Sequence, residues 1–257
     1  MRVCADPNNL PFSNARGEGF ENALAELVAR DLGRRLVHVW WAQRRGFIRN
    51  TLNAGLCDVV MGTPKLDMLD ATEPYYRSAY VFVSRADREL DISSIKDPRL
   101  RELRIGVHLI GDDGSNVPPA HALSQQGIVT NLVGYSIYGD YRESDPPARL
   151  IEAVAAGEVD IAAAWGPLAG YFAKRSAVEL RVTPMIDTIS FIPLVFEYPI
   201  AMGVRRGDPL KDELNGVIRR RGAEIKALLE SYGVPVMEPR RPRPPARRSA
   251  PALVSPR

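Results

Sequence analysis

The sequence predicts an α/β protein with two lobes, each a mostly parallel sheet flanked by helices. Short apolar segments alternate along the chain with segments of helical periodicity, which is the pattern of β-α-β units. This alternation restarts near residue 104, after a stretch that follows neither pattern. The chain has 257 residues, enough for two such lobes.

The first lobe is predicted from a β-α-β-α-β pattern at the start of the chain. Residues 2–5 (RVCA) indicate a buried strand. Residues 19–32 predict a helix, because their apolar side chains recur on one face and Gly33 is a typical helix stop. The elements that follow are strand 35–41, helix 45–55, strand 57–62 and a long strand within 73–85.

The second lobe is predicted from a new series that opens with the apolar strand 103–110. The prolines that open segment 118–127 indicate a helix beginning. The expected elements are helix 118–127, strand 130–135, helix 146–157, strand 158–166, helix 167–175 and strand 178–184.

A last strand, 199–205, and helix 208–232 have no lobe of their own, so we expect the chain to return to the first lobe. Two crossings between lobes predict a hinged clamshell, with a ligand cleft at the carboxyl ends of the strands. The predicted division is lobe 1 at 1–85 and 199–236, lobe 2 at 104–184, hinge segments at 86–103 and 185–198, and a tail at 237–257.

The charge of the chain is uneven. The formal net charge is +3, yet residues 239–257 contain six arginines and no acid, so the remainder has 28 basic and 31 acidic residues. Six prolines and few large apolar residues predict that this tail is disordered or in a polyproline conformation. The tail is either simply solvated or a contact for an acidic partner or membrane.

Several function classes find no support in the sequence. No apolar run approaches the roughly 18 residues of a membrane span, and Met1 leads directly into a strand without a signal peptide. Nucleophile, phosphate-loop and metalloprotease motifs are absent, and the three histidines show no metal spacing. We expect no enzyme activity, no cofactor, no metal and no nucleic-acid partner, and we interpret His38 and His108 as structural residues.

The order of motifs along residues 1–236 resembles the solute-binding proteins (family 3) of polar amino-acid ABC importers. A subgroup is more similar: the periplasmic J proteins of methanol dehydrogenase operons, the MxaJ/XoxJ type. The stretches that carry this resemblance are VCADPNNLPFSN, WWAQRRGFIRNTLNAGLCDVVMG, IGDDGSNVPPAHAL, GYSIYGDY and WGPLAGYFAKR.

The resemblance implies a periplasmic, two-lobed type II binding protein that assists a PQQ- and metal-dependent methanol dehydrogenase. A protein partner or a peptide would then bind in the cleft. The alternative is an ABC-importer receptor for a small solute other than an amino acid, and an enzyme on this fold is a third hypothesis. If the protein is exported, its leader is not part of this chain.

Amino-acid binders of this type hold their ligand with two charged side chains that are missing here. One is an arginine after the third strand, and no Arg occurs between Gly62 and Tyr76. Lys65 does not replace it at a bidentate site. The other is an aspartate, at whose position Trp165 stands. We therefore predict that ordinary α-amino acids are not ligands.

The expected cleft is aromatic instead. Such rings suit an apolar or planar ligand or a segment of another protein, although several could be core residues. Because Trp40 and Trp41 are adjacent in a strand, we expect one of them to be buried. The aromatic candidates are Phe12, Trp41, Tyr75, Tyr76, Tyr138 and Trp165, with Thr63 at the end of the third strand as a polar candidate.

Three loops supply further candidates. Asn8 and Asn9 follow the first strand and either form a lip of the cleft or a turn that satisfies its own backbone. Gln43, Arg44 and Arg45 precede a helix start and either bind an anionic ligand or an acidic partner, or face solvent. Asp112 and Asp113 lie in a loop that lacks the spacing of a calcium site, and we interpret them as cleft candidates.

The two cysteines support a more specific prediction. In a sheet with the strand order 2-1-3, Cys4 and Cys57 lie in neighbouring parallel strands about 4.8 Å apart, close to disulfide spacing. The bond would close a loop of about 54 residues and contribute up to about 4 kcal/mol. Export to the periplasm would permit it. The alternative is a pair of buried thiols.

Overall fold

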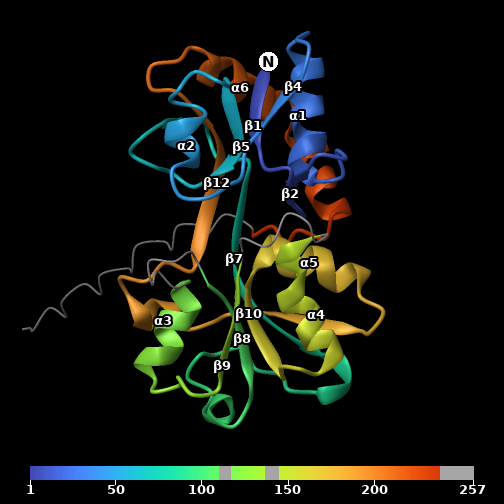
Figure 1. Ribbon diagram of the computed structural model, residues 1–257, viewed down its shortest axis with the longest axis vertical. Coiled ribbons are helices and arrows are strands. Elements are labelled where there is room, and N and C mark those ends of the chain that lie inside the picture. The colour runs from blue at the N-terminus through green and yellow to red at the C-terminus, as the bar shows by residue number, and fades with distance from the viewer. Residues whose placement is uncertain (110–116, 137–144, 238–257) are drawn as a thin grey trace, which may run out of the picture.

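The computed structural model describes residues 1–109, 117–136 and 145–237, which form two lobes stacked along the long axis (Figure 1). Each lobe has a central sheet with helices against it, as the sequence predicts. Asp112, Asp113 and Tyr138, like the tail beyond residue 237, lie outside the described residues.

The sheet of the first lobe has the predicted strand order. β1 (Arg2–Ala5) lies between β4 (Val37–Trp40) and β5 (Val59–Thr63), and all three are parallel. The antiparallel β12 (Glu197–Val204) pairs with β5, so the chain joins the sheet of β1 and β5 again at this point. The two-residue strand β6 (Asp70–Ala71) pairs with β12, and the helices are α1 (Phe20–Asp31), α2 (Phe47–Asn50) and α6 (Leu210–Ser231).

The second lobe repeats this plan. Its parallel strands are β9 (Leu132–Ser136), β8 (Ile105–Leu109) and β10 (Ile161–Trp165), and the antiparallel β7 (Tyr76–Arg85) lies beside β10. β11 (Leu180–Pro184) pairs with β7 as well. The helices are α3 (Pro118–Gln125), α4 (Arg149–Ala156) and α5 (Gly166–Arg175), with 3-10 turns at 86–88, 98–101, 146–148 and 188–191.

Two long strands run from one lobe into the other (Figure 1). β7 pairs with β12 through Tyr76–Ala79 and with β10 further along, so the two sheets are continuous. The segment 86–103 packs on the second lobe, because Ile92, Ile95 and Leu100 belong to the apolar cluster around Phe82. Phe191 and Phe196 of the other expected hinge segment join the same cluster. The lobe boundaries themselves stay predictions.

A disulfide joins β1 to the segment just before β5, and it was predicted from the sequence. Cys4 and Cys57 are bonded, with their Cα atoms 5.5 Å apart. Both are buried in a small apolar cluster with Leu52 and Val60. The bond follows from the parallel register, which sets Cys4 opposite Val60, three residues after Cys57.

The prediction that one of the adjacent tryptophans is buried is wrong. Trp40 is 37% and Trp41 44% exposed. β4 pairs with β1 alone among the described strands, so it lies at the edge of the sheet, where neither face is covered completely. Trp40 stacks on His38 with a ring distance of 4.8 Å.

The residues that directly follow α6 pack the first lobe against the second. The rings of Tyr171 in α5 and Tyr232 are stacked, with centroids 6.0 Å apart. The Ser78 hydroxyl in β7 donates to the carbonyl oxygen of Pro235, at 2.9 Å. Among the described residues, no helix has both the length and the apolar content needed to cross a membrane.

Candidate functional site

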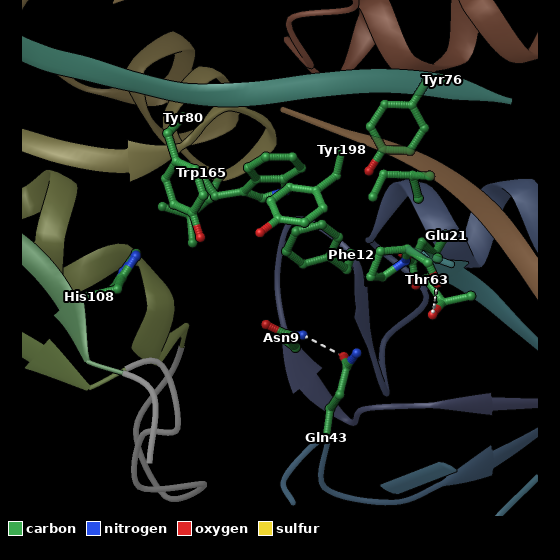
Figure 2. A pocket seen from close by; sticks show the side chains of 14 residues that line it. Asn9, Phe12, Glu21, Gln43, Thr63, Tyr76, Tyr80, His108, Trp165 and Tyr198 are labelled. Atoms are coloured by element: carbon green, nitrogen blue, oxygen red, sulfur yellow. Dashed lines mark hydrogen bonds between the residues drawn. The ribbon is translucent and has the colours of Figure 1, made fainter. Parts of the chain in front are cut away.

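A cavity of about 450 Å³ lies where the two lobes meet (Figure 2). Side chains of both lobes and of the two crossing strands line it. They are Asn9, Phe12, Glu21, Gln43, Gly62, Thr63, Pro64, Tyr76, Tyr80, His108, Trp165, Leu168, Tyr198 and Ile200. No lysine or arginine is among these residues.

The crossing strands supply three of the aromatic rings. In β7, Tyr76 and Tyr80 are four positions apart and therefore face the same side of the strand. Tyr198 in β12 lies opposite Ser78, so its ring is set between those two positions. Burial raises the pKa of the Tyr76, Tyr80 and Tyr198 hydroxyls, so all three stay neutral and can donate or accept hydrogen bonds.

Trp165 brings a fourth ring from the second lobe. It ends β10 and directly precedes α5, which places it at the carboxyl edge of the parallel strands. Its indole packs edge-on against Tyr80 at 5.3 Å and Tyr198 at 5.8 Å. Trp165 is only partly buried, so part of the indole surface stays open to a ligand.

The loop after β1 brings Phe12 and Asn9 to the cavity. Residues 8–9 and 13–14 pair as a small hairpin, and Phe12 packs against Phe20 of α1 at 5.4 Å. The buried carboxylate of Asp6 fixes this loop, since it accepts hydrogen bonds from the backbone N–H groups of Asn8 (2.8 Å) and Gln43 (2.6 Å). The Asn9 amide donates to the Gln43 side chain at 3.0 Å (Figure 2).

Glu21 supplies the acidic group of the site. It lies in the first turn of α1, and its carboxyl group approaches the backbone of Gly62 in β5. Burial raises its pKa from 4.5 to about 8, and no other cause acts on it. Near neutral pH a large share of Glu21 is therefore protonated and uncharged.

His108 lines the cavity from the second lobe, at the opposite end from Glu21 (Figure 2). Its imidazole donates to the carbonyl oxygen of Pro147, and burial lowers its pKa to about 4. The other ring nitrogen, Nε2, is buried and makes no hydrogen bond to any part of the chain that the structure describes. Our interpretation of His108 as a fully satisfied structural residue is therefore wrong.

Comparison with known proteins decides the family. The chain is 34% identical to Protein MoxJ of Methylorubrum extorquens over 247 residues, which cover 92% of this chain and 81% of the relative. The chain belongs to the MoxJ family. No protein-family model matches the sequence.

Solved structures agree with this membership. The crystal structure of the periplasmic binding protein XoxJ from Methylobacterium extorquens AM1 has 37% identity and a TM-score of 0.77, with 93% of this chain and 100% of XoxJ covered. MxaJ from Methlophaga aminisulfidivorans MPT has 28% identity and a TM-score of 0.80, with 92% and 100% covered. The two-lobed type II architecture expected from the sequence is confirmed.

The cavity of this MoxJ-family protein gathers only part of the predicted site. It brings together Asn9, Phe12, Thr63, Tyr76 and Trp165. Arg44 and Arg45 line an adjoining hollow that shares Gln43, Gly62, Thr63 and Pro64 with the cavity. Asn8, Trp41 and Tyr75 do not line the cavity, and Asp112, Asp113 and Tyr138 lie outside the described residues.

The position of Tyr75 has a simple cause. Tyr75 precedes β7, so strand alternation does not separate it from Tyr76, and the two rings pack against each other with centroids 5.0 Å apart. Tyr76 lines the cavity, whereas the Tyr75 hydroxyl donates to the carbonyl oxygen of Met61 at 2.9 Å. The hydrogen bond to Met61 therefore directs the Tyr75 hydroxyl to the backbone of β5.

Four polar or aromatic residues of the cavity were not predicted as site residues from the sequence: Glu21, Tyr80, His108 and Tyr198. The period of two along β7 could have added Tyr80 once Tyr76 was proposed. His108 precedes the carboxyl end of its strand by one residue, which could have placed it at the cleft. Nothing in the sequence distinguishes Glu21 from an ordinary acid in a first helical turn.

Proposed function

We propose that this MoxJ-family protein is a periplasmic accessory protein of a PQQ-dependent methanol dehydrogenase, and that it binds a peptide or protein segment in the aromatic cavity. It acts by binding and carries out no reaction itself. The location in the periplasm is consistent with the disulfide, which forms readily in an oxidising compartment.

One observation supports this proposal above the others: five rings from both lobes converge on a cavity that lacks a cationic lining residue. The rings are Phe12, Tyr76, Tyr80, Trp165 and Tyr198. An amino-acid carboxylate would find no arginine among the lining residues to hold it. Aromatic side chains are the typical anchors of protein interfaces, where they bury large apolar areas.

The adjoining hollow extends the aromatic cavity along the first lobe. Arg44 and Arg45 line it together with apolar side chains such as Phe47 and Ile48. A bound segment longer than one side chain would continue from the cavity into this hollow. We expect the lobes to close over the segment by bending of β7 and β12, the two strands that run between them.

The experiment that tests this function is capture of the dehydrogenase from periplasmic extract by the immobilised protein. We compare the wild type with Trp165→Ala and use Trp41→Ala as the matched control, because Trp41 is exposed outside the cavity. Truncation of a buried interface tryptophan typically costs about 2 kcal/mol or more, roughly a 30-fold loss of affinity. Equal capture by all three proteins would contradict binding in the cavity.

The second candidate function is an importer receptor for a small solute that is not an amino acid. The cavity volume of about 450 Å³ favours it, because this volume suits a small molecule. Small-angle scattering discriminates the two functions. Lobe closure on addition of a small solute, without capture of the dehydrogenase, would support the receptor.

A further inference from the structure

The cavity contains one carboxyl group that lacks a partner. Glu21 makes no side-chain hydrogen bond and no ion pair within the described residues, and burial alone accounts for its raised pKa. Removing a carboxylate from water without a compensating partner is unfavourable. An empty cavity therefore leaves Glu21 partly protonated, whereas a bound cation would compensate its charge.

The groups around Glu21 provide no such cation. Gly62 of β5 has no side chain, and Tyr75 and Tyr76 carry neutral hydroxyls whose pKa values are raised well above 10. His38 of β4 lines a small hollow together with Glu21 and Asn22, where it is hydrogen-bonded to Asn22 and burial lowers its pKa, so it is uncharged at pH 7. In the described part of the chain, the groups that face Glu21 are therefore uncharged at pH 7.

The cavity lining also contains polar atoms that can accept hydrogen bonds from a ligand. The Asn9 amide donates to Gln43, and the Thr63 hydroxyl donates to the carbonyl oxygen of Pro64 at 2.8 Å. Their oxygens remain as acceptors. The imidazole N–H of His108 is directed to Pro147, so the unpaired Nε2 is an acceptor too. A ligand that donates hydrogen bonds would satisfy these atoms.

Aromatic rings lie beside Glu21 and form the apolar part of the cavity. Phe12 and Tyr76 line the cavity together with Glu21, and Trp165 and Tyr198 extend the aromatic wall toward the second lobe (Figure 2). Aromatic faces attract organic cations by about 0.5–2 kcal/mol each and also bury methylene groups. A carboxylate beside such rings fits an alkyl chain that ends in an ammonium group.

We propose that this cavity binds an alkylammonium group, with the ammonium paired to Glu21 and the carbon chain against the rings. The inference rests on the proposed function, because it specifies what the aromatic cavity receives. Two sources share this chemistry: a free alkylamine and a lysine side chain of a bound protein segment. An α-amino acid that bound through its α-ammonium group would differ from both, because its carboxylate would lie near Glu21 without a cation.

Binding of the ammonium must ionise Glu21. Since the pKa of Glu21 is about 8 in the empty cavity, binding at lower pH releases a proton. Affinity is therefore expected to rise about tenfold for each pH unit between pH 6 and pH 8 and to level off above. Alkylammonium ions keep their charge through this range, because their pKa is near that of lysine, about 10.4.

The test is calorimetric titration of the full chain with n-butylammonium chloride at pH 6, 7 and 8. This ion has the length of a lysine side chain, and n-butanol is the neutral ligand of equal length. The variant is Glu21→Gln, which keeps the shape and removes the charge. The matched control is Glu26→Gln on the same helix, since Glu26 is exposed and does not line the cavity.

We expect butylammonium to bind the wild type and Glu26→Gln with affinity that rises with pH. We expect at least a tenfold loss and no pH dependence in Glu21→Gln, whose folding is checked by its thermal transition. Equal binding of butanol, equal binding by Glu21→Gln or no heat of binding would each overturn the proposal. Dehydrogenase capture is measured separately. The proposed accessory function and the binding of an alkylammonium group can therefore fail independently of each other.

A second titration with N-acetyl-lysine methylamide separates the two sources. Tighter binding of this blocked lysine than of butylammonium supports a lysine side chain on a protein segment. Tighter binding of butylammonium supports a free amine. Both results support recognition of an alkylammonium group, whereas binding of the corresponding blocked norleucine with equal affinity would contradict it.

Discussion

Gly170 of α5 and Gly233, two residues after α6, meet backbone to backbone across the two lobes. A Cβ atom at residue 170 would overlap with the carbonyl oxygen of Gly233 and lie 3.1 Å from the Pro235 ring. Gly233 has a φ of +78°, which favours glycine. The close approach lets the Tyr171 and Tyr232 rings stack beside it. The two glycines therefore set how closely the end of the first lobe packs on the second.

We predict that Gly170→Ala lowers the free energy of unfolding by about 1–3 kcal/mol, because an overlap with rigid backbone must be relieved by moving α5. Urea denaturation measures this change. The control is Gly222→Ala in the exposed part of α6, where a Cβ meets nothing within 4 Å and the change should stabilise by about 0.5–1 kcal/mol. Equal stability of the two variants would show that α5 adapts without cost.

The disulfide gives a prediction for stability. Removing it in the double variant Cys4→Ala/Cys57→Ala is expected to lower the free energy of unfolding by about 2–4 kcal/mol, since the bond constrains an unfolded loop with a sequence separation of 53 residues. Urea unfolding with and without a reducing agent measures the effect. The reducing agent should destabilise the wild type and leave the double variant unchanged.

His108 makes stability depend on pH. Its pKa is about 4 in the folded protein against 6.5 in the unfolded chain, so the unfolded chain binds more protons between these values. The free energy of unfolding should therefore fall as the pH drops from 6.5 to 4, by up to about 3 kcal/mol in total. The opposite slope is expected for Glu21, whose raised pKa removes stability as the pH rises from 4.5 to 8.

The two contributions can be separated. His108→Gln cannot gain a proton, so the loss of stability below pH 6.5 should become smaller, while Glu21→Gln should flatten the curve above pH 4.5. An NMR titration of the His108 ring in the wild type tests the same claim without a variant. A pKa for His108 close to 6.5 would contradict its burial as an uncharged ring.

The fold was largely predictable because it depends on periodicity. The strand order around β1, the return of β12 to the first lobe and the Cys4–Cys57 bond all follow from which segments are strands and from parallel packing. The exposure of Trp40 and Trp41 was not predictable in this way. The alternation of side chains along a strand predicts that neighbours point to opposite faces of the sheet. It does not predict whether the strand lies at an uncovered edge of that sheet.

The site was less predictable because it depends on which side chains converge from distant segments. Phe12, Tyr76 and Trp165 follow from their places at strand ends or after them. Tyr198 lies in a stretch that the sequence marks only as a crossing. The role of Glu21 depends on Gly62, 41 positions along the chain, and local sequence carries no sign of that contact.

That contact yields the last prediction. A Cβ atom at residue 62 would overlap with Oε1 of Glu21, the movable end of a side chain. Gly62→Ala should therefore displace the carboxyl group from the cavity while changing the free energy of unfolding by less than about 1 kcal/mol, because a flexible side chain adapts more readily than backbone.

Displacement of Glu21 should weaken butylammonium binding at pH 8 at least tenfold in Gly62→Ala, as in Glu21→Gln, whereas Gly222→Ala should bind like the wild type. The double variant Gly62→Ala/Glu21→Gln should bind no more weakly than Glu21→Gln alone, since both changes remove the same interaction. Additive losses of affinity in the double variant would mean that the ligand itself occupies the space beside Gly62 that the added methyl group fills.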